Sequence, residues 1–256
     1  MRAAGFANLV TAIRGVDLDA VDGAINTPYQ FPSMLVEYVR VEPPGIPTAF
    51  WRGVGPTHNV FVVESFVDEL AAAAGQDPVA YRRLLLGNSP RALAVLDLAA
   101  ARAEWGHAMP TGFGRGISLQ HVFGTYMAQV AEVEVRGAEV RVSRVVAAVD
   151  CGIQVNPDII TAQVQSGIIF GAGAALHGEI TLKDGRVQQS NFHDYRVLRM
   201  NEAPVIEVHL VASSEPPGGM GEPGTSAVMP AIANAVFAAT GKRVRKLPIV
   251  TAIAAP

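Results

Sequence analysis

The stretch from Met127 to Asp150 reads MAQVAEVEVRGAEVRVSRVVAAVD, and its pattern decides the fold class. Apolar and polar side chains alternate over Met127–Val135, as in a strand with one buried face. Gly137-Ala138 interrupts the alternation, which resumes from Glu139 to Val149. Two such runs with a short break between them predict a β-hairpin whose β-branched face is buried.

Helical patterns precede this hairpin. Asp77 and Ser89 are each followed by a proline, an arrangement typical of an N-cap and the first helical turn. Gly75 is a plausible C-cap of a helix before them. The helices are therefore predicted in series over residues 63–74, 77–86 and 89–105. Further upstream, residues 34–41 (MLVEYVRV) predict a strand by their β-branched and aromatic content.

The chain after the hairpin mixes both kinds of element. Asn156-Pro157-Asp158 opens a long apolar stretch to about Leu176, which predicts a buried helix with tight packing at its glycines. The remaining predictions are a hairpin turn at Lys183-Asp184-Gly185, a strand over 205–212, a glycine- and proline-rich loop over 213–230, and a helix over 230–240. The predicted fold class is α+β, with hairpins and a mixed sheet packed with helices.

No clear linker or repeat divides the chain, which we interpret as one partial domain over 1–256. Its parts are an irregular lead-in over 1–40, a glycine-rich turn with helices over 41–110, and hairpins, a buried helix, a glycine-rich loop and a last helix over 111–256.

Composition narrows the function classes. The net charge is −3 and the charged fraction is 17%, so no nucleic-acid partner is expected; the densest basic run, 242–246, is short. A single cysteine excludes an iron–sulfur cluster or a cysteine-rich zinc site built from this chain alone. The six histidines show no metal-ligand spacing, so no protein metal site is expected. No membrane segment and no signal peptide are expected either.

The least ordinary stretch is residues 216–225, PPGGMGEPGT. Its glycines let a ligand approach the main chain closely. Glu222 precedes Pro223 and is therefore biased towards an extended conformation. A carboxylate fixed on such a loop suits a general base, whereas the alternative is an exposed glutamate on a surface loop.

Two further segments carry candidate binding residues. Phe50–Pro56 (FWRGVGP) is a glycine-rich turn before a helix, which binds anions well, with Arg52 as a further ligand. The alternative is a tight turn whose arginine caps a carbonyl. Gln163 lies in an apolar helix and needs a partner for its amide, either a cofactor or a neighbouring backbone group. Cys151 is interpreted as a small buried hydrophobic residue.

Together these segments resemble, in the same order, the xanthine oxidase or aldehyde oxidoreductase family. The matching motifs are Trp51-Arg52-Gly53-Val54-Gly55, Gln163-Val164-Gln165-Ser166-Gly167 and Gly221-Glu222-Pro223-Gly224-Thr225. The chain also shares longer phrases with large subunits like that of isoquinoline 1-oxidoreductase, at residues 58–83, 149–158, 178–195 and 230–248. The resemblance extends from about Tyr38 onward.

The resemblance implies the C-terminal part of a molybdenum-cofactor-binding domain. The enzyme would oxidise aldehydes or N-heterocycles with water as the oxygen source, and Glu222 would be its general base. The cofactor would be molybdenum–molybdopterin in its cytosine dinucleotide form, with Trp51, Arg52, Gly53, Val54, Gln163 and Gly221 as binding residues. Val54 stands where several members place a phenylalanine, so stacking on a flat purine is not expected there.

The resemblance also implies partners. Family large subunits are much longer, and a Gly-x-x-x-Gly-Gln-Gly-like segment that helps hold the cofactor is not found here. The rest of the large subunit and a small 2Fe–2S subunit are therefore expected as partners, with any heme or flavin on partner chains. The alternative is a truncated, non-catalytic remnant or assembly module without cofactor. The expected location is the cytoplasm, or the periplasm if the chain is exported with a partner.

Overall fold

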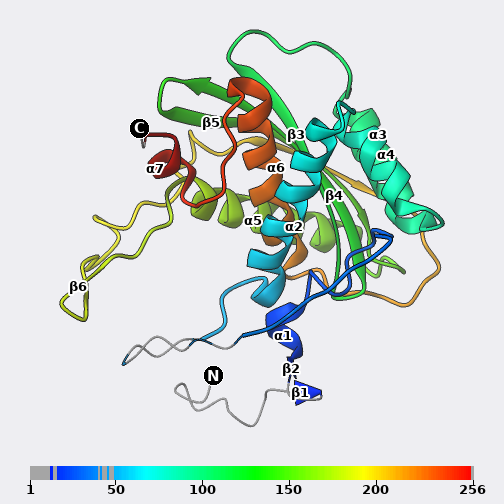
Figure 1. The fold of residues 1–256 in the computed structure, drawn as a ribbon, viewed down its shortest axis with the longest axis horizontal. Coiled ribbons are helices and arrows are strands. Elements are labelled where there is room, and N and C mark those ends of the chain that lie inside the picture. The colour runs from blue at the N-terminus through cyan, green and yellow to red at the C-terminus, as the bar shows by residue number, and fades with distance from the viewer. Residues whose placement is uncertain (1–11, 14–15, 40, 42–44, 46–48, 255–256) are drawn as a thin grey trace.

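The computed structural model describes residues 12–13, 16–39, 41, 45 and 49–254, and its fold is α+β (Figure 1). A four-stranded sheet in the order β3-β4-β5-β8 lies at its centre. The strands are β3 (Phe113–Val122), β4 (Thr125–Arg136), β5 (Glu139–Asp150) and β8 (Val205–Leu210). The first three pair antiparallel and β8 lies parallel to β5. The predicted fold class and mixed sheet are confirmed.

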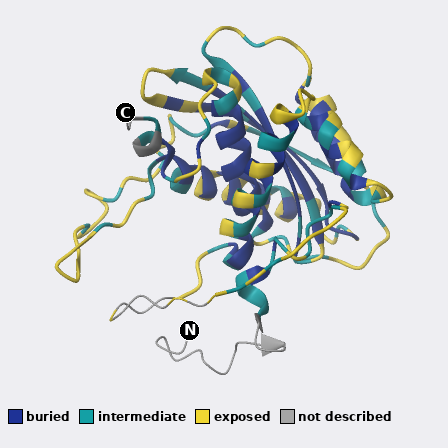
Figure 2. Ribbon diagram, viewed as in Figure 1, coloured by how far each residue is buried: buried dark blue, intermediate teal, exposed yellow. Residues whose placement is uncertain are grey.

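Helices cover both faces of this sheet. On one face lie α5 (Pro157–His177) and α6 (Pro223–Thr240), and α2 (Val54–Ala73) packs against α6. On the other face lies α4 (Pro90–Arg102), with α3 (Pro78–Leu86) beside it. Each face has its own hydrophobic cluster. Figure 2 shows that α6 and the middle of the sheet are buried.

The hairpin and the three helices before it are confirmed, although α2 begins at Val54, nine residues before its predicted start at residue 63. The other ends shift by at most three residues. The hairpin is β4–β5, in which Arg136 faces Glu139 across the turn. Asp77 caps α3 as predicted, because its carboxylate accepts hydrogen bonds from the amides of Val79 and Ala80 at 2.9 Å. Strand β3 precedes the hairpin and extends it into a three-stranded meander that was not predicted.

Helix α6 begins at Pro223, so the predicted loop over 213–230 is wrong for its second half. Pro223 occupies the first turn, where its missing N–H costs no hydrogen bond. Pro230 lies inside the helix and does not end it. Every residue from Pro223 to Val236 is buried, so tertiary packing outweighs the weak helix propensity of this segment.

The remaining segments are short. The strand predicted over 34–41 is wrong: residues 34–39 and 41 lie in no strand, and residue 40 lies outside the described residues. The hairpin turn at Asp184-Gly185 is confirmed. The other short elements are β1 (Ala12–Ile13), β2 (Val16–Asp17), α1 (Leu18–Val21), β6 (Leu182–Lys183), β7 (Arg186–Val187) and α7 (Ile249–Ala254).

Helix α5 is long and apolar enough to cross a membrane by length and composition, which was not expected. Half of its most apolar window is buried inside the structure, as is common for a helix that packs against a sheet. This feature is therefore weak support for a membrane span.

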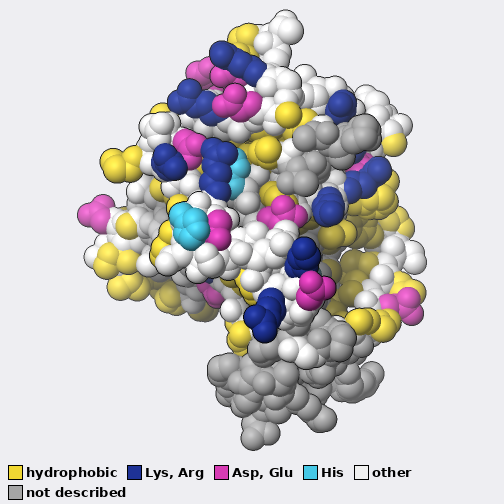
Figure 3. Space-filling view, turned by 90° about the vertical axis from the view of Figure 1, so that its left-hand side faces the viewer, with side chains coloured by type: hydrophobic (Ala, Val, Ile, Leu, Met, Phe, Trp, Pro, Cys, Tyr) yellow, Lys and Arg dark blue, Asp and Glu magenta, His cyan; other side chains and the backbone are white. Residues whose placement is uncertain are grey.

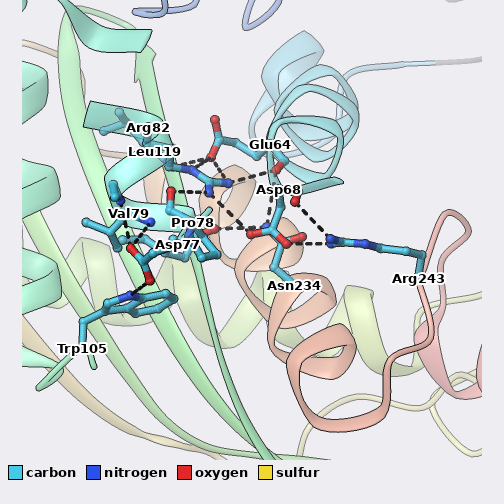
Figure 4. Close-up of polar contacts among 12 residues, drawn as sticks. Glu64, Asp68, Asp77, Pro78, Val79, Arg82, Trp105, Leu119, Asn234 and Arg243 are labelled. Atoms are coloured by element: carbon cyan, nitrogen blue, oxygen red, sulfur yellow. Dashed lines mark hydrogen bonds and ion pairs between the residues drawn. The ribbon is translucent and has the colours of Figure 1, made fainter. Parts of the chain in front are cut away.

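A buried ionic network fixes α2 against the rest of the fold (Figure 4). Arg82 on α3 is fully buried and donates to Glu64 Oε2 at 3.1 Å. The same Glu64 oxygen accepts from the backbone amide of Leu119 on β3 at 2.8 Å. Asp68, one helical turn after Glu64, pairs with Arg82 at 3.5 Å and with Arg243 at 2.6 Å. The network thereby fixes the C-terminal half of α2 against α3, β3 and the segment that carries Arg243.

Candidate functional site

The three segments singled out in the sequence meet around Arg52. Its Nε donates to Gly221 O at 2.8 Å, and its Nη1 donates to Ser166 Oγ at 3.0 Å. Its Nη2 donates to Gln163 Oε1 at 3.2 Å. One guanidinium thus joins the turn before α2, the middle of α5 and the loop before α6. The N-terminal ends of α2 and α6 lie close together in Figure 1.

The turn that carries Arg52 needs its glycine. Gly53 is the N-cap of α2 with φ of 98°, a conformation that L side chains rarely adopt. A Cβ at Gly53 would lie 2.1 Å from Thr57 Oγ1, which donates to Arg52 O at 2.9 Å. Val54 follows with φ of 48°, which is uncommon for a β-branched residue. Strained backbone of this kind concentrates at functional sites.

Glu222, at the start of α6, contacts the turn that carries Arg52 and Gly53. It is half-buried at the N-cap of α6, yet its carboxylate does not cap its own helix. Instead Glu222 Oε1 accepts a hydrogen bond from Gly53 N at 3.0 Å. The N-terminal end of a helix favours negative charge, so this location suits a carboxylate. The alternative of an exposed glutamate on a surface loop is wrong, because Glu222 is half-buried at the start of a helix.

Close helix packing brings α5 to the same place. A Cβ at Gly167 would lie 3.0 Å from Gly224 Cα, and one at Gly171 would lie 2.5 Å from Thr225 O. These glycines therefore allow α5 to touch the first turn of α6, as the predicted tight packing requires. Gln163 is exposed on α5, so the alternative of a glutamine satisfied within the core is wrong.

An aromatic pair lies beside the polar cluster. The rings of Trp51 and Phe170 stack with centroids 4.7 Å apart, and the Arg52 guanidinium lies 5.9 Å from the Phe170 ring. These residues line a cavity of about 490 Å³ between α5 and the segment around Tyr195. Val54 lines a different cavity, of about 250 Å³, together with Trp51 and His58.

Ser166 and Phe170 were not predicted as site residues. With Gln163 they follow the i, i+3, i+7 spacing that places side chains on one face of a helix. That spacing could have identified them. A larger cavity of about 640 Å³ lies at the C-terminal end of α5, near His177, and none of the predicted site residues lines it.

The described residues contain no group of three or more His, Cys, Asp or Glu side chains that could hold a metal ion. Trp51, Arg52, Gly53, Gln163, Gly221 and Glu222 are brought together, whereas Val54 points to the neighbouring cavity. Their roles in binding and catalysis stay predictions.

Comparisons with known proteins agree with this architecture. The model of the molybdopterin cofactor-binding domain family matches residues 91–204. The fold resembles that of quinoline 2-oxidoreductase from Pseudomonas putida 86, with a TM-score of 0.68 at 14% identity over 78% of this chain and 51% of that chain. At this identity the likeness shows the fold alone.

Two curated relatives extend the match in sequence. The beta subunit of isoquinoline 1-oxidoreductase from Brevundimonas diminuta is 36% identical over 214 residues, which are 82% of this chain and 27% of that protein. A nicotinate dehydrogenase subunit of Pseudomonas putida is 36% identical over 242 residues, which are 87% of this chain and 20% of that protein. The chain therefore spans about a quarter of the length of these relatives.

The family match, the two relatives and the shared fold lead to one conclusion. The chain belongs to the xanthine oxidase family and corresponds to the C-terminal portion of its molybdopterin-binding large subunits.

Proposed function

We propose that the chain is part of the large subunit of a molybdenum hydroxylase that oxidises aldehydes or N-heterocycles, with water as the oxygen source and Glu222 as the general base. The observation that carries the proposal is the hydrogen bond of 3.0 Å from Gly53 N to Glu222 Oε1. It joins two motifs that lie 169 residues apart in the chain. A general base must be held near the reacting atoms, and this bond fixes one carboxylate oxygen.

The groups of the site suit the organic part of a molybdopterin cofactor, for which we propose the cytosine dinucleotide form. Arg52 bonds to Gln163 and Ser166, and all three side chains keep further N–H or O–H donors that match polar ligand atoms. The cavity of about 490 Å³ beside them lies within the usual size range of ligand pockets. No neighbour lies within 4 Å of a Cβ built at Gly221, so the main chain there is open to a ligand.

Each residue has a distinct task in this proposal. When bound, the molybdenum centre supplies the two-electron oxidation, while the protein supplies position and proton handling. Gly53 N holds Glu222 Oε1, and Oε2 is the oxygen that we propose accepts the proton. Arg52 fixes the main chain before Glu222 through Gly221 O, and Trp51 with Phe170 closes the apolar side of the cavity.

The partners that we propose are the remaining part of the large subunit and a small 2Fe–2S subunit, in the cytoplasm. Large apolar side chains are exposed on α5 beside the site, as is typical of surfaces that contact another polypeptide. They are Ile159 (60% exposed), Ile169 (39%) and Phe170 (43%). The part of each relative's chain that this chain does not match is long enough to cover these three side chains.

Replacing Glu222 by glutamine in the assembled enzyme tests the proposal. Glutamine keeps an oxygen that accepts from Gly53 N, but it cannot accept the proton. We expect kcat to fall on the order of 10²- to 10⁴-fold, with molybdenum content and melting temperature unchanged. The matched control is Glu215→Gln, which changes an exposed glutamate upstream in the same loop and should leave turnover at the wild-type level. Wild-type turnover in Glu222→Gln would refute the assignment of the base.

A further inference from the structure

Side chains from outside α6 bind the main-chain carbonyls around Glu222. All four consecutive carbonyl oxygens of residues 221–224 accept hydrogen bonds. Their donors are, in chain order, Arg52 Nε (2.8 Å), Thr225 N (2.9 Å), Gln120 Nε2 (2.6 Å) and Gln129 Nε2 (3.2 Å). Two of the four donors are thus glutamines of the central sheet, Gln120 on β3 and Gln129 on β4.

Side chains along β3 set the distance between this strand and α6. At one end the helix backbone touches the strand, because a Cβ at Gly114 would lie 2.1 Å from Ala235 O and one at Gly116 would lie 2.4 Å from Ala231 O. Two residues further along, Ser118 Oγ donates to a helix carbonyl at 2.6 Å. The alternating positions 114, 116, 118 and 120 therefore carry Gly, Gly, Ser and Gln, with side chains that lengthen towards Glu222.

The strand and the helix run antiparallel with matching repeats. Positions 116, 118 and 120 of β3 face Ala231, Ala227 and Pro223 of α6. Two strand residues span about 7 Å and four helix residues span about 6 Å. Every second residue of β3 therefore faces every fourth residue of α6. Gln120 is the last and longest member, and it reaches the residue directly after Glu222.

The orientation of Gln120 is fixed at both ends of its amide. While Nε2 donates to Pro223 O, Oε1 accepts from Ser226 Oγ at 2.6 Å. Gln120 is 2% exposed, so water does not compete for these bonds. Gln129 is fully buried, and its Oε1 has no partner among the described residues. Leaving a buried oxygen without a partner lowers stability, so packing alone does not explain a glutamine there.

We propose that Gln120, assisted by Gln129, is a positioning residue that sets where the Glu222 carboxylate points. Gln120 acts through the carbonyl of Pro223, and Gln129 acts through that of Gly224. Both hold the first turn of α6 at the height above the sheet that lets Glu222 Oε1 meet Gly53 N. This inference rests on the proposed function, because it names what aligns the proposed base.

The variant Gln120→Met in the assembled enzyme tests the proposal, because methionine has a similar volume but cannot donate to Pro223 O. We expect kcat to fall on the order of 10- to 100-fold while KM stays within about threefold of the wild-type value. Molybdenum content should not change. Hydrogen exchange should become faster at the amides of residues 222 and 224–228 and stay unchanged in the sheet.

The matched control is Ser118→Ala, which removes the neighbouring bond one helical turn further on, to Ala227 O. Its kcat should stay within about twofold of the wild-type value. If Gln120→Met fails to fold, Gln129→Met takes its place, since removing an amide with an unpartnered oxygen disturbs folding less. We expect Gln129→Met to lower kcat without lowering the melting temperature.

Wild-type kcat in folded Gln120→Met, or in Gln129→Met where it takes its place, would overturn the proposal. An equal fall of kcat in Ser118→Ala would overturn it as well. Glu222→Gln separates this failure from failure of the proposed function. If Glu222→Gln is inactive while Gln120→Met or its substitute Gln129→Met is fully active, Glu222 is the base, and Gln120 and Gln129 do not position it. If Glu222→Gln retains turnover, the assignment of the base itself fails.

Discussion

At the residue scale, the charge of Asp150 ties α4 to the end of the sheet. Its two carboxylate oxygens accept from Arg91 Nε at 2.7 Å and Arg91 Nη2 at 2.8 Å. Burial by itself raises the pKa of Asp150, but the hydrogen bonds from Arg91 and from Gly152 N outweigh it and leave this pKa lowered. The ionised form is therefore favoured in the folded state.

A lowered folded-state pKa predicts how stability changes in acid. The pair contributes stability above the unfolded-state pKa of an aspartate, about 3.9, and loses it as pH falls through the lower folded-state pKa. We expect the difference in unfolding free energy between wild type and Arg91→Met to be largest above about pH 5 and to shrink in acid. Urea unfolding at a series of pH values measures it. A difference that grows as pH falls would contradict the assignment.

The residues of the site could be named from the sequence, but their contacts could not. Spacing alone favours an exposed surface loop for Glu222, and only the resemblance over long phrases gave it a role. The Gly53–Glu222 bond joins residues 169 positions apart, a separation over which local patterns carry no information. Gln129 was not predicted, because a glutamine in an alternating strand pattern looks like a solvent-facing residue. Gln120 was not predicted, because it lies on β3, which the sequence pattern did not identify as a strand.

At the scale of elements, α2 and α3 depend on the buried Arg82. This guanidinium bonds Glu64 Oε2, Glu64 O and Pro78 O, and it has no exposure to solvent (Figure 4). A buried ion pair adds little over an apolar pair of the same shape, but removing one partner leaves a charge without compensation. The next residue, Arg83, forms an exposed pair with Asp97 at 2.7 Å.

These adjacent arginines allow a matched comparison. Arg82→Met should lower the free energy of unfolding by about 3–5 kcal/mol, because Glu64 then stays buried without its cation. Arg83→Met should lower it by less than about 1 kcal/mol, since solvent screens the pair with Asp97. Chemical denaturation of both variants measures the difference. Equal losses in the two variants would show that the network is not the stabilising feature described.

The elements predicted correctly are those whose pattern agrees with their packing. The β4–β5 hairpin has one buried alternating face, and α3 and α4 have a proline in the first turn. Prediction failed where packing opposes propensity. Strand β3 was not predicted, because Gly114 and Gly116 interrupt its strand pattern. The structure needs these glycines there to let α6 approach the strand. Residues 34–41 resemble a strand, yet the described ones among them lie in none, and Leu35 and Val39 are about four-fifths exposed.

At the scale of the whole molecule, charge does not point to a nucleic-acid surface. The net charge is −3, and positive and negative side chains are interspersed with hydrophobic ones on the face shown in Figure 3. The fold instead brings the residues that we propose bind a cofactor together at the N-terminal ends of α2 and α6 and the middle of α5. The relatives that share this fold contain much more chain than the part matched here.

We propose that α2, α5 and α6 hold a molybdenum cofactor, and the first measurement to make is the molybdenum content of the purified protein. Elemental mass spectrometry would be applied to the protein isolated gently from its native host with any bound partners. We expect close to one molybdenum per chain. Absence of molybdenum, in a host whose related enzymes are loaded normally, would contradict it and favour a non-catalytic remnant.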